Sequence, residues 1–321
     1  MVRSVDIRTW SILGMRGTFG TYLYKLSQEN EDIVALTADL AITSGLKKFF
    51  DNNPDRSYNI GIAENNMIGI AAGMADEGKV PFATTFSNFA ALRSCEHIRH
   101  FMGYMNCNVK LVGIGAGFAM ELFGNTHYAI EDMAIVRSIP NVVLLSPADG
   151  LELTKCVKAA YEHEGPVYIR LTGVMNHPVV HKEDYDFEIG KAVTIREGSD
   201  VTLFATGSMV SVTLKAADIL EEKGISCSVI DIHTVKPIDK ECILTNRDSK
   251  LYVSVEEHRV NGGLGTAIAD VLAETDEKMP ALLKLGCNEE FKRAGTYPYM
   301  LEQNRLTPEL IAEDVLNKLG K

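Results

Sequence analysis

A glutamate at the start of an expected helix has the clearest chemical potential in this chain. Glu64 follows a short β-type run and precedes a helix-type run that is apolar on nearly every face. Burial would raise the pKa of its carboxyl group, whereas the N-terminus of the helix would lower it. On physical chemistry alone, a capping role that stabilises the helix start is favoured over acid–base work.

Two phenylalanines follow the next β-type run. Phe86 and Phe89 are three positions apart, so they share one face if a helix begins there. Such a pair can clamp a flat heterocycle by stacking. Taken alone, the pattern is more typical of two rings in a hydrophobic core.

A glycine-dense segment follows a further β-type run and leads to a histidine. Gly113, Gly115 and Gly117 do not match the G-x-G-x-x-G fingerprint, and no acidic residue ends a second strand about 20 positions on, which excludes a dinucleotide site. A loop that lines a pocket and carries His127 as an acid–base group is the remaining functional hypothesis. A structural role is the alternative, and a lone histidine more often has it.

These residues need a scaffold that brings strand ends together. Short β-branched runs alternate with helical periods, which is typical of a parallel sheet with crossover helices. In the first half, this pattern predicts strands at residues 32–39, 58–62, 80–85, 108–114, 141–145 and 166–171, and helices at 16–29, 65–77 and 151–163.

The periodicity then stops and starts again. Residues 172–190 are rich in Gly, His, Pro and charges, which indicates a linker. Beyond it, the pattern predicts strands at 200–205, 226–233 and 250–256, and helices at 209–223, 265–274 and 307–319. The predicted fold class is α/β, with two doubly wound domains at residues 1–178 and 190–321.

Composition narrows the function classes. The 321 residues carry a net charge of -11, which argues against a nucleic-acid partner. No apolar run approaches the roughly 20 residues of a membrane helix, and residues 1–10 do not read as a secretory signal. The six cysteines are scattered without a C-x-x-C pair. We therefore expect a cytoplasmic protein without disulfides or a zinc cage.

Taken together and in this order, the motifs resemble the C-terminal half of transketolase, as found in enzymes split into two subunits. The matching stretches span essentially the whole chain, at residues 37–40, 61–67, 71–75, 85–86, 126–127, 131–132, 140–141, 147–149, 205–208, 234–239, 255–258 and 262–265. The resemblance implies a pyrimidine-binding domain followed by a transketolase C-terminal domain. It also implies transfer of a two-carbon ketol unit from a ketose to an aldose.

The resemblance implies a role for each candidate residue. Glu64 matches the glutamate that binds N1′ of the aminopyrimidine of thiamine diphosphate, the cofactor that supplies the reactive chemistry. Phe86 matches the ring that stacks on the pyrimidine, with Phe89 beside it. His127 matches a residue near the substrate hydroxyls, suited to hydrogen bonding or proton transfer.

The substrate side combines matches with departures. Arg16 and Thr43 fall where the family holds a substrate phosphate with an arginine and a serine. Where the family has a histidine, this chain has Gly115. Where the family has an aspartate that faces the substrate, it has Phe123. The family's second phosphate-binding arginine falls near Gly173, where this chain has no arginine to match it. A deoxy, sulfonated, branched or unphosphorylated ketose is therefore expected in place of the usual sugar phosphates.

The chain lacks the family's metal motif. Ala148-Asp149-Gly150, followed by Asn176, loosely resembles Gly-Asp-Gly with a downstream asparagine, but the first glycine is alanine and residues 147–149 match another family element. We predict no metal ligand here. The resemblance implies that an N-terminal partner subunit with Gly-Asp-Gly binds Mg²⁺ or Ca²⁺ and the diphosphate, and that the two subunits form an α2β2 assembly.

Three alternatives remain open from the sequence. The β subunit of a 2-oxo acid dehydrogenase E1 and the second half of a deoxyxylulose phosphate synthase share this architecture. Thr85-Phe86 and Thr126-His127 fit transketolase better. A catalytically idle binding subunit is the third alternative: Gly115 and Phe123 favour it, whereas Glu64 and Phe86 argue against it.

Overall fold

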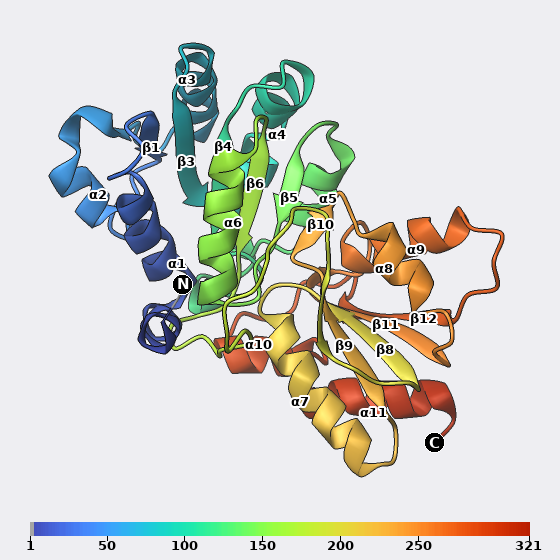
Figure 1. Ribbon diagram of the computed structural model, residues 1–321. Coiled ribbons are helices and arrows are strands. Elements are labelled where there is room, and N and C mark those ends of the chain that lie inside the picture. Colours follow the sequence, from blue (N-terminus) through green and yellow to red (C-terminus); the bar gives the residue numbers. More distant parts are fainter. Residues whose placement is uncertain (1–2) are drawn as a thin grey trace.

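The computed structural model describes residues 3–321, which form two α/β domains placed side by side (Figure 1). The first contains a seven-stranded sheet in the order β10-β5-β6-β4-β3-β1-β2. Its strands are β1 (Ile33–Thr37), β2 (Ser57–Asn59), β3 (Val80–Phe86), β4 (Lys110–Ile114), β5 (Val143–Leu145), β6 (Val167–Leu171) and β10 (Thr234–Lys236). All neighbours are parallel except β10, which is antiparallel to β5.

Helices cover both faces of this sheet, as a doubly wound fold requires. They are α1 (Ser4–Leu26), α2 (Lys47–Asn52), η1 (Pro54–Arg56), α3 (Glu64–Asp76), η2 (Phe89–Arg93), α4 (Cys95–His97), η3 (Ile98–Tyr104), η4 (Glu121–Thr126), α5 (Asp132–Ser138) and α6 (Gly150–Glu162). Alternate residues of β1 divide between the faces. Val34 and Leu36 pack in the core that α3 covers, whereas Ile33 and Ala35 pack in the core that α1 and α6 cover.

The second domain contains a five-stranded sheet in the order β12-β11-β8-β9-β7. Its strands are β7 (Val193–Arg196), β8 (Val201–Ala205), β9 (Cys227–Asp231), β11 (Leu251–Arg259) and β12 (Ala281–Cys287), and only β7 is antiparallel to its neighbour. Its helices are α7 (Met209–Glu222), α8 (Lys240–Thr245), α9 (Leu264–Ala273), α10 (Tyr297–Gln303) and α11 (Pro308–Leu319). One core lies under α7 and α11, and the other lies under α8 and α9.

The predicted elements are all present, with ends that shift by a few residues. The helix predicted at 16–29 is longer: α1 begins at Ser4 and is broken at Gly14, where φ is 65° and ψ is -177°. The edge strands β7, β10 and β12 and the short helices α2, α4, α5, α8 and α10 were not predicted from the sequence. Two of these strands are antiparallel, so each sheet is mixed and not purely parallel.

A buried polar network joins the domains. Arg170, on β6, donates to the Asp132 carboxylate at 2.9 Å and to the backbone carbonyls of Ala129 and Glu257 at 3.0 and 2.9 Å. The Glu257 side chain accepts from the backbone of the first domain and from the hydroxyl of Tyr297 at 2.7 Å. A buried charge is stable only with such partners, so these contacts fix how the domains sit together.

Across the described residues, none of the helices has both the length and the apolar character needed to span a bilayer.

Candidate functional site

The candidate residues gather at the carboxyl ends of the parallel strands, where open α/β sheets bind ligands. Glu64 is the first residue of α3, which is separated from β2 by residues 60–63, and its side chain is only 3% exposed. Both carboxylate oxygens accept from Nη1 of Arg93 at 2.8 Å. Glu64 is also the acidic residue in the first turn of α3, the position at which a carboxylate stabilises a helix start. The buried contact with Arg93 adds to that capping role and does not exclude it.

Three of the predicted residues form an aromatic wall beside this carboxylate. The rings of Phe86 and Phe89 lie edge to face with centroids 6.0 Å apart, and His127 lies 5.9 and 5.4 Å from them. Phe86, Phe89 and His127 are half-buried, so each keeps some exposed surface. Nδ1 of His127 is 2.9 Å from the hydroxyl of Thr126. The structure thus brings together residues that are separated by up to 63 positions in the sequence.

Arg93 is the residue of this site that the sequence analysis missed. Its guanidinium carbon lies 4.0 Å from the centroid of the Phe89 ring, a cation–π contact. The available signal was the spacing of four between Phe89 and Arg93, which places both on one face of a helix. The contact with Glu64 had no local signal, because 29 positions separate the two residues.

Unpartnered polar atoms adjoin the same residues. Asn65 Oδ1, Thr85 Oγ1 and Asn88 Oδ1 are buried and make no hydrogen bond within residues 3–321. Asn65 follows Glu64 in the chain, whereas Thr85 and Asn88 flank the segment that carries Phe86. A buried acceptor without a donor is costly, so this region suits a bound group that presents N–H donors.

The predicted phosphate-binding residues lie on adjacent elements. Arg16 is half-buried just after the break in α1. Burial lowers the pKa of Arg16, and the negative charge of Glu121 opposes this shift. Thr43 is exposed in the loop that follows β1, and this loop packs on α1 where Gly20 meets Gly45. The structure therefore places the two residues on neighbouring segments, and the loop at Gly45 approaches the backbone oxygen of Arg16.

At two of the positions where the chain departs from the family, the backbone conformation favours glycine. Gly115 has φ of 68°, and a Cβ there would lie 2.6 Å from the sulfur of Met120. Gly173 has φ of 78°, and a Cβ there would lie 2.4 Å from Nδ1 of His177. Neither position accepts a histidine or an arginine without rearrangement.

Phe123 lies at the outer edge of the site. Its ring centroid is 5.1 Å from that of His127, yet the residue is 66% exposed. A ring that was fully buried here would keep water out of the site. Phe123 is not buried, so its apolar ring leaves a large exposed surface next to the site.

Asp149, in the stretch that loosely resembles the metal motif, is a structural residue. Its carboxylate caps α6 by accepting from the backbone N–H of Glu152 at 3.0 Å, and it accepts from the backbone N–H groups of Val180 and His181 at 2.8 Å. Hydrogen bonds that occupy both oxygens hold the linker against the first domain. The geometry is that of a helix cap and not of a metal ligand.

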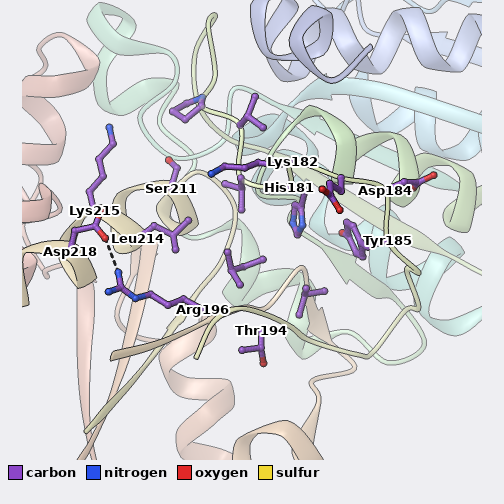
Figure 2. A pocket seen from close by; sticks show the side chains of 16 residues that line it. His181, Lys182, Asp184, Tyr185, Thr194, Arg196, Ser211, Leu214, Lys215 and Asp218 are labelled. Atoms are coloured by element: carbon purple, nitrogen blue, oxygen red, sulfur yellow. Dashed lines mark hydrogen bonds and ion pairs between the residues drawn. The ribbon is translucent and has the colours of Figure 1, made fainter. Parts of the chain in front are cut away.

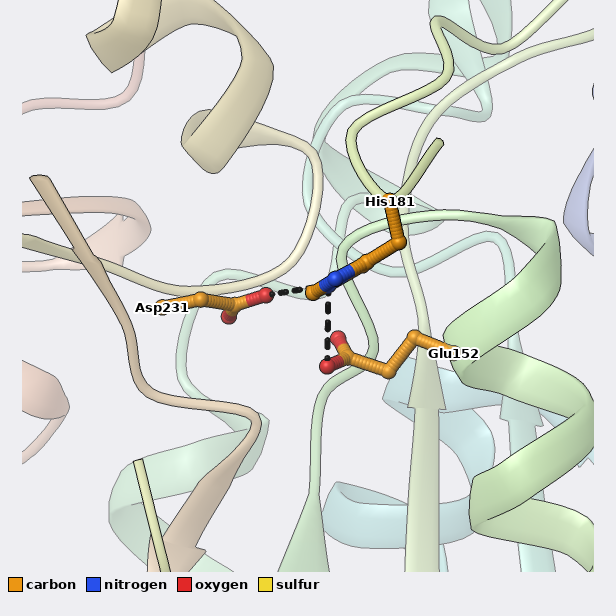
Figure 3. A group of neighbouring side chains, drawn as sticks. All are labelled: Glu152, His181 and Asp231. Atoms are coloured by element: carbon orange, nitrogen blue, oxygen red, sulfur yellow. Dashed lines mark hydrogen bonds and ion pairs between the residues drawn. The ribbon is translucent and has the colours of Figure 1, made fainter. Parts of the chain in front are cut away.

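A second titratable cluster lies between the domains (Figure 3). Nε2 of His181 is 3.1 Å from the carboxylate of Asp231 and 3.3 Å from that of Glu152, and all three side chains are buried. Burial opposes the charged imidazole, but the hydrogen bonds to Asp231 and Glu152 outweigh it and raise the pKa of His181 to about 10. Burial also opposes the Glu152 carboxylate, but the His181 hydrogen bond outweighs it and lowers the pKa of Glu152 to about 2.

These three groups are of the types that ligate metals. Here the imidazole nitrogen already lies within hydrogen-bonding distance of both carboxylates. This is the geometry of a shared proton, so we interpret the cluster as an ionic clasp between the domains.

A cavity of about 1020 Å³ adjoins this clasp but none of the predicted site residues (Figure 2). It lies between the linker and the second domain. Arg196 on its wall is paired with Asp218 at 2.7 Å. The buried carboxylate and the aromatic wall at the strand ends are a better indication of chemistry than the size of this cavity.

Comparison with known proteins identifies both domains. Residues 13–173 match the family model of the transketolase pyrimidine binding domain, and residues 190–311 match that of the transketolase C-terminal domain. The 6-deoxy-6-sulfo-D-fructose transketolase subunit of Clostridium sp. strain MSTE9 is 40% identical over 92% of this chain and 92% of its own length. A subunit of the apulose-4-phosphate transketolase of Actinobacillus succinogenes is 36% identical over 76% of this chain and 78% of its own length.

A solved structure gives the same result. A split gene transketolase, described as an inactive beta4 tetramer, superposes with a TM-score of 0.85 at 40% identity, covering 94% of this chain and 97% of that one. The chain belongs to the transketolase family, whose cofactor is thiamine diphosphate. Its two domains are the pyrimidine-binding domain and the C-terminal domain of that family.

Proposed function

We propose that this chain is the pyrimidine-holding subunit of a two-subunit transketolase that acts on a non-standard ketose. The observation that carries the proposal is the buried Glu64 carboxylate at the foot of the wall formed by Phe86, Phe89 and His127. The matches at residues 13–173 and 190–311 support domain limits of 1–178 and 190–321. Six free cysteines support a reducing, cytoplasmic location.

The residues present suit an aminopyrimidine. Glu64 would hold the proton at the ring nitrogen N1′, and the orphaned oxygens of Asn65 and Asn88 are acceptors of the kind that an amino group needs. Thiamine diphosphate, when bound, supplies the carbon centre that takes up the ketol unit. The protein contributes binding, orientation and exclusion of water.

The position of Arg93 supports a different order of the two phenylalanines. The group that binds Glu64 in the free chain is the Arg93 guanidinium, and it lies over Phe89. A planar group that reaches Glu64 therefore has the Phe89 face available. We propose Phe89 as the stacking ring and Phe86 as its edge support, the reverse of the order expected from the resemblance.

We propose that a partner subunit completes the site. Large apolar side chains stand exposed on the loops and the π-helical turn that adjoin the candidate residues, namely Ile42, Ile62, Leu92, Leu122 and Phe123. Their exposure is unusual for a soluble surface and indicates a protein interface. The Gly-Asp-Gly motif, the metal and the diphosphate would belong to the partner, in an α2β2 assembly.

Reconstitution tests the proposal. The chain alone should bind thiamine diphosphate weakly and have no ketol transfer activity, because diphosphate affinity depends largely on the metal that the partner holds. Adding the partner subunit should restore tight, metal-dependent binding, measured by calorimetry, together with turnover. Tight metal-dependent binding by the chain alone would refute the proposal that the partner binds the metal and the diphosphate. An assembly that is complete but inactive would favour the alternative of a catalytically idle binding subunit.

The substrate side supports a donor with a less charged terminus or a missing hydroxyl. Phe123 gives no acceptor to a hydroxyl, and Gly173 provides no second cation, so Arg16 is the proposed main anchor for an anion. The relatives from Clostridium and Actinobacillus are named for a sulfonated fructose and for apulose 4-phosphate, respectively. Because both relatives are named for non-standard sugars, they support a non-standard donor for this chain.

A donor panel with the assembled enzyme checks the substrate class. We expect fructose 6-phosphate and xylulose 5-phosphate to be poor donors. Arg16→Ala should raise the Michaelis constant about 10-fold or more for an anionic donor, the loss of roughly 1.5–3 kcal/mol from a charged hydrogen bond, and should leave a neutral donor nearly unchanged. Arg8→Ala, a change of the same type at an exposed position of α1, is the control. Xylulose 5-phosphate as the best donor would overturn the assignment.

A further inference from the structure

Arg93 occupies the place that a planar ligand needs in order to use both Glu64 and Phe89. Its Nη1 lies 2.8 Å from each carboxylate oxygen, and its Cζ lies 4.0 Å from the centroid of the Phe89 ring. One planar group thus makes an edge contact with the acid and a face contact with the ring. A second planar group cannot make the same two contacts while the first is in place.

An aminopyrimidine presents the same kinds of surface as a guanidinium. Both are flat, both have nitrogen atoms at the edge that hydrogen-bond a carboxyl group, and both stack on an aromatic face. We propose that Arg93 is a latch that fills the pyrimidine position of the free subunit and must swing away before the cofactor binds. This inference rests on the proposed function, because it takes Glu64 as the residue that holds the pyrimidine.

The contacts of Arg93 are suited to release. Only Nη1 reaches the carboxylate, so the pair lacks the two parallel hydrogen bonds of a bidentate fork. The Arg93 side chain is 45% exposed, so the guanidinium can move into water without crossing a packed core. Arg93 also ends η2, a π-helical segment, and π-helical turns often mark functional sites.

The latch has a role while the partner is absent. A carboxylate that is 3% exposed needs a counter-charge, and Arg93 supplies it until the cofactor arrives. The same contact keeps the aromatic face covered. Binding of the pyrimidine must therefore displace an existing interaction, which lowers the affinity that the free chain can show.

The test uses the full chain without its partner and a probe that lacks the diphosphate. The probe is 4-amino-5-hydroxymethyl-2-methylpyrimidine, and its dissociation constant is measured by NMR titration. Arg93→Ala should bind it about 5- to 30-fold more tightly than wild type, which corresponds to about 1–2 kcal/mol at 1.4 kcal/mol per tenfold. Arg93→Lys, which keeps the charge but loses the flat face, should fall between them.

Matched controls separate the latch from general effects of charge. Arg99→Ala removes an exposed arginine from η3, six positions further along the chain, and should leave the affinity unchanged. Thermal melting of each variant reports whether it is folded. Unchanged or weaker binding of the probe by folded Arg93→Ala would overturn the latch.

The variant Glu64→Gln distinguishes failure of the latch from failure of the proposed function. In the Arg93→Ala background, Glu64→Gln should lower the affinity for the probe by at least the factor by which Arg93→Ala raised it. If Glu64→Gln has no effect, the pyrimidine does not bind at Glu64, and the proposed function fails with the latch. If Glu64→Gln lowers the affinity for the probe but Arg93→Ala does not raise it, only the latch fails.

Discussion

Replacement of Glu64 by glutamine should slow exchange of the C2 proton of the bound cofactor by orders of magnitude in the assembled enzyme. The carboxyl group lies at the foot of the aromatic wall, where Arg93 contacts both it and the Phe89 ring. An amide of the same shape cannot exchange a proton with the ring nitrogen. The measurement is deuterium exchange at C2, followed by NMR after acid quench.

The fold should survive this change. Glutamine is nearly isosteric, and Arg93 is exposed enough to hydrate once its partner is neutral, so we expect a loss of only about 1 kcal/mol of stability. Glu77→Gln is the matched control, because it neutralises an exposed acid at the other end of the same helix. Exchange at the wild-type rate in Glu64→Gln would return Glu64 to a structural role.

The second large effect concerns stability. His181→Ala removes the cation between two buried carboxylates and should lower the free energy of unfolding by about 3–5 kcal/mol, the usual cost of an uncompensated buried charge. Urea denaturation measures it. The double variant His181→Ala/Glu152→Gln should recover part of the loss, because Glu152 is the charge left without a partner, whereas burial and the charge of Glu152 raise the pKa of Asp231 well above its usual value. His100→Ala, at an exposed position, should change stability by less than about 0.5 kcal/mol.

The same clasp predicts a pH dependence. The folded pKa of His181 is raised to about 10, so its contribution is complete below the unfolded value near 6.5 and is lost as the pH rises towards 10. The folded pKa of Glu152 is lowered to about 2, so its contribution is present above about 4.5 and is lost as the pH falls towards 2. The melting temperature of His181→Ala should therefore vary less than that of wild type between pH 7 and 10. Parallel profiles would contradict the shared proton.

The sequence predicted the inner strands because a buried parallel strand needs an apolar, β-branched run on both faces. It also predicted the six longest helices, namely α1, α3, α6, α7, α9 and α11, and left out the shorter ones. It missed the N-terminal part of α1, where residues 4–13 mix polar and apolar side chains without a clear stripe. It also missed β10, which is three residues long and obtains its stability from a neighbour in the other domain. Such an edge strand has no local signature of its own.

The sequence also predicted some residues of the candidate site and not others. Glu64, Phe86 and Phe89 were found because each lies at or within a few residues of a strand end, and His127 was found because it lies on the glycine-rich segment that follows β4. Strand ends converge in this fold. The pairing of Glu64 with Arg93 depends on how the segment after β3 winds back over α3, which residue spacing does not encode. The His181 clasp joins three elements that are far apart in sequence, so no local pattern could predict it.

The strand β10 has a consequence for synthesis on the ribosome. The first six strands of the first sheet are complete once Leu171 has emerged, yet the free edge of β5 is covered only when Thr234 follows, 63 positions later. During that interval the nascent chain presents an unpaired strand edge, which is a template for pairing with another chain. The emerging first domain is thus most open to misassembly with its neighbours on a polysome before the second domain has been made.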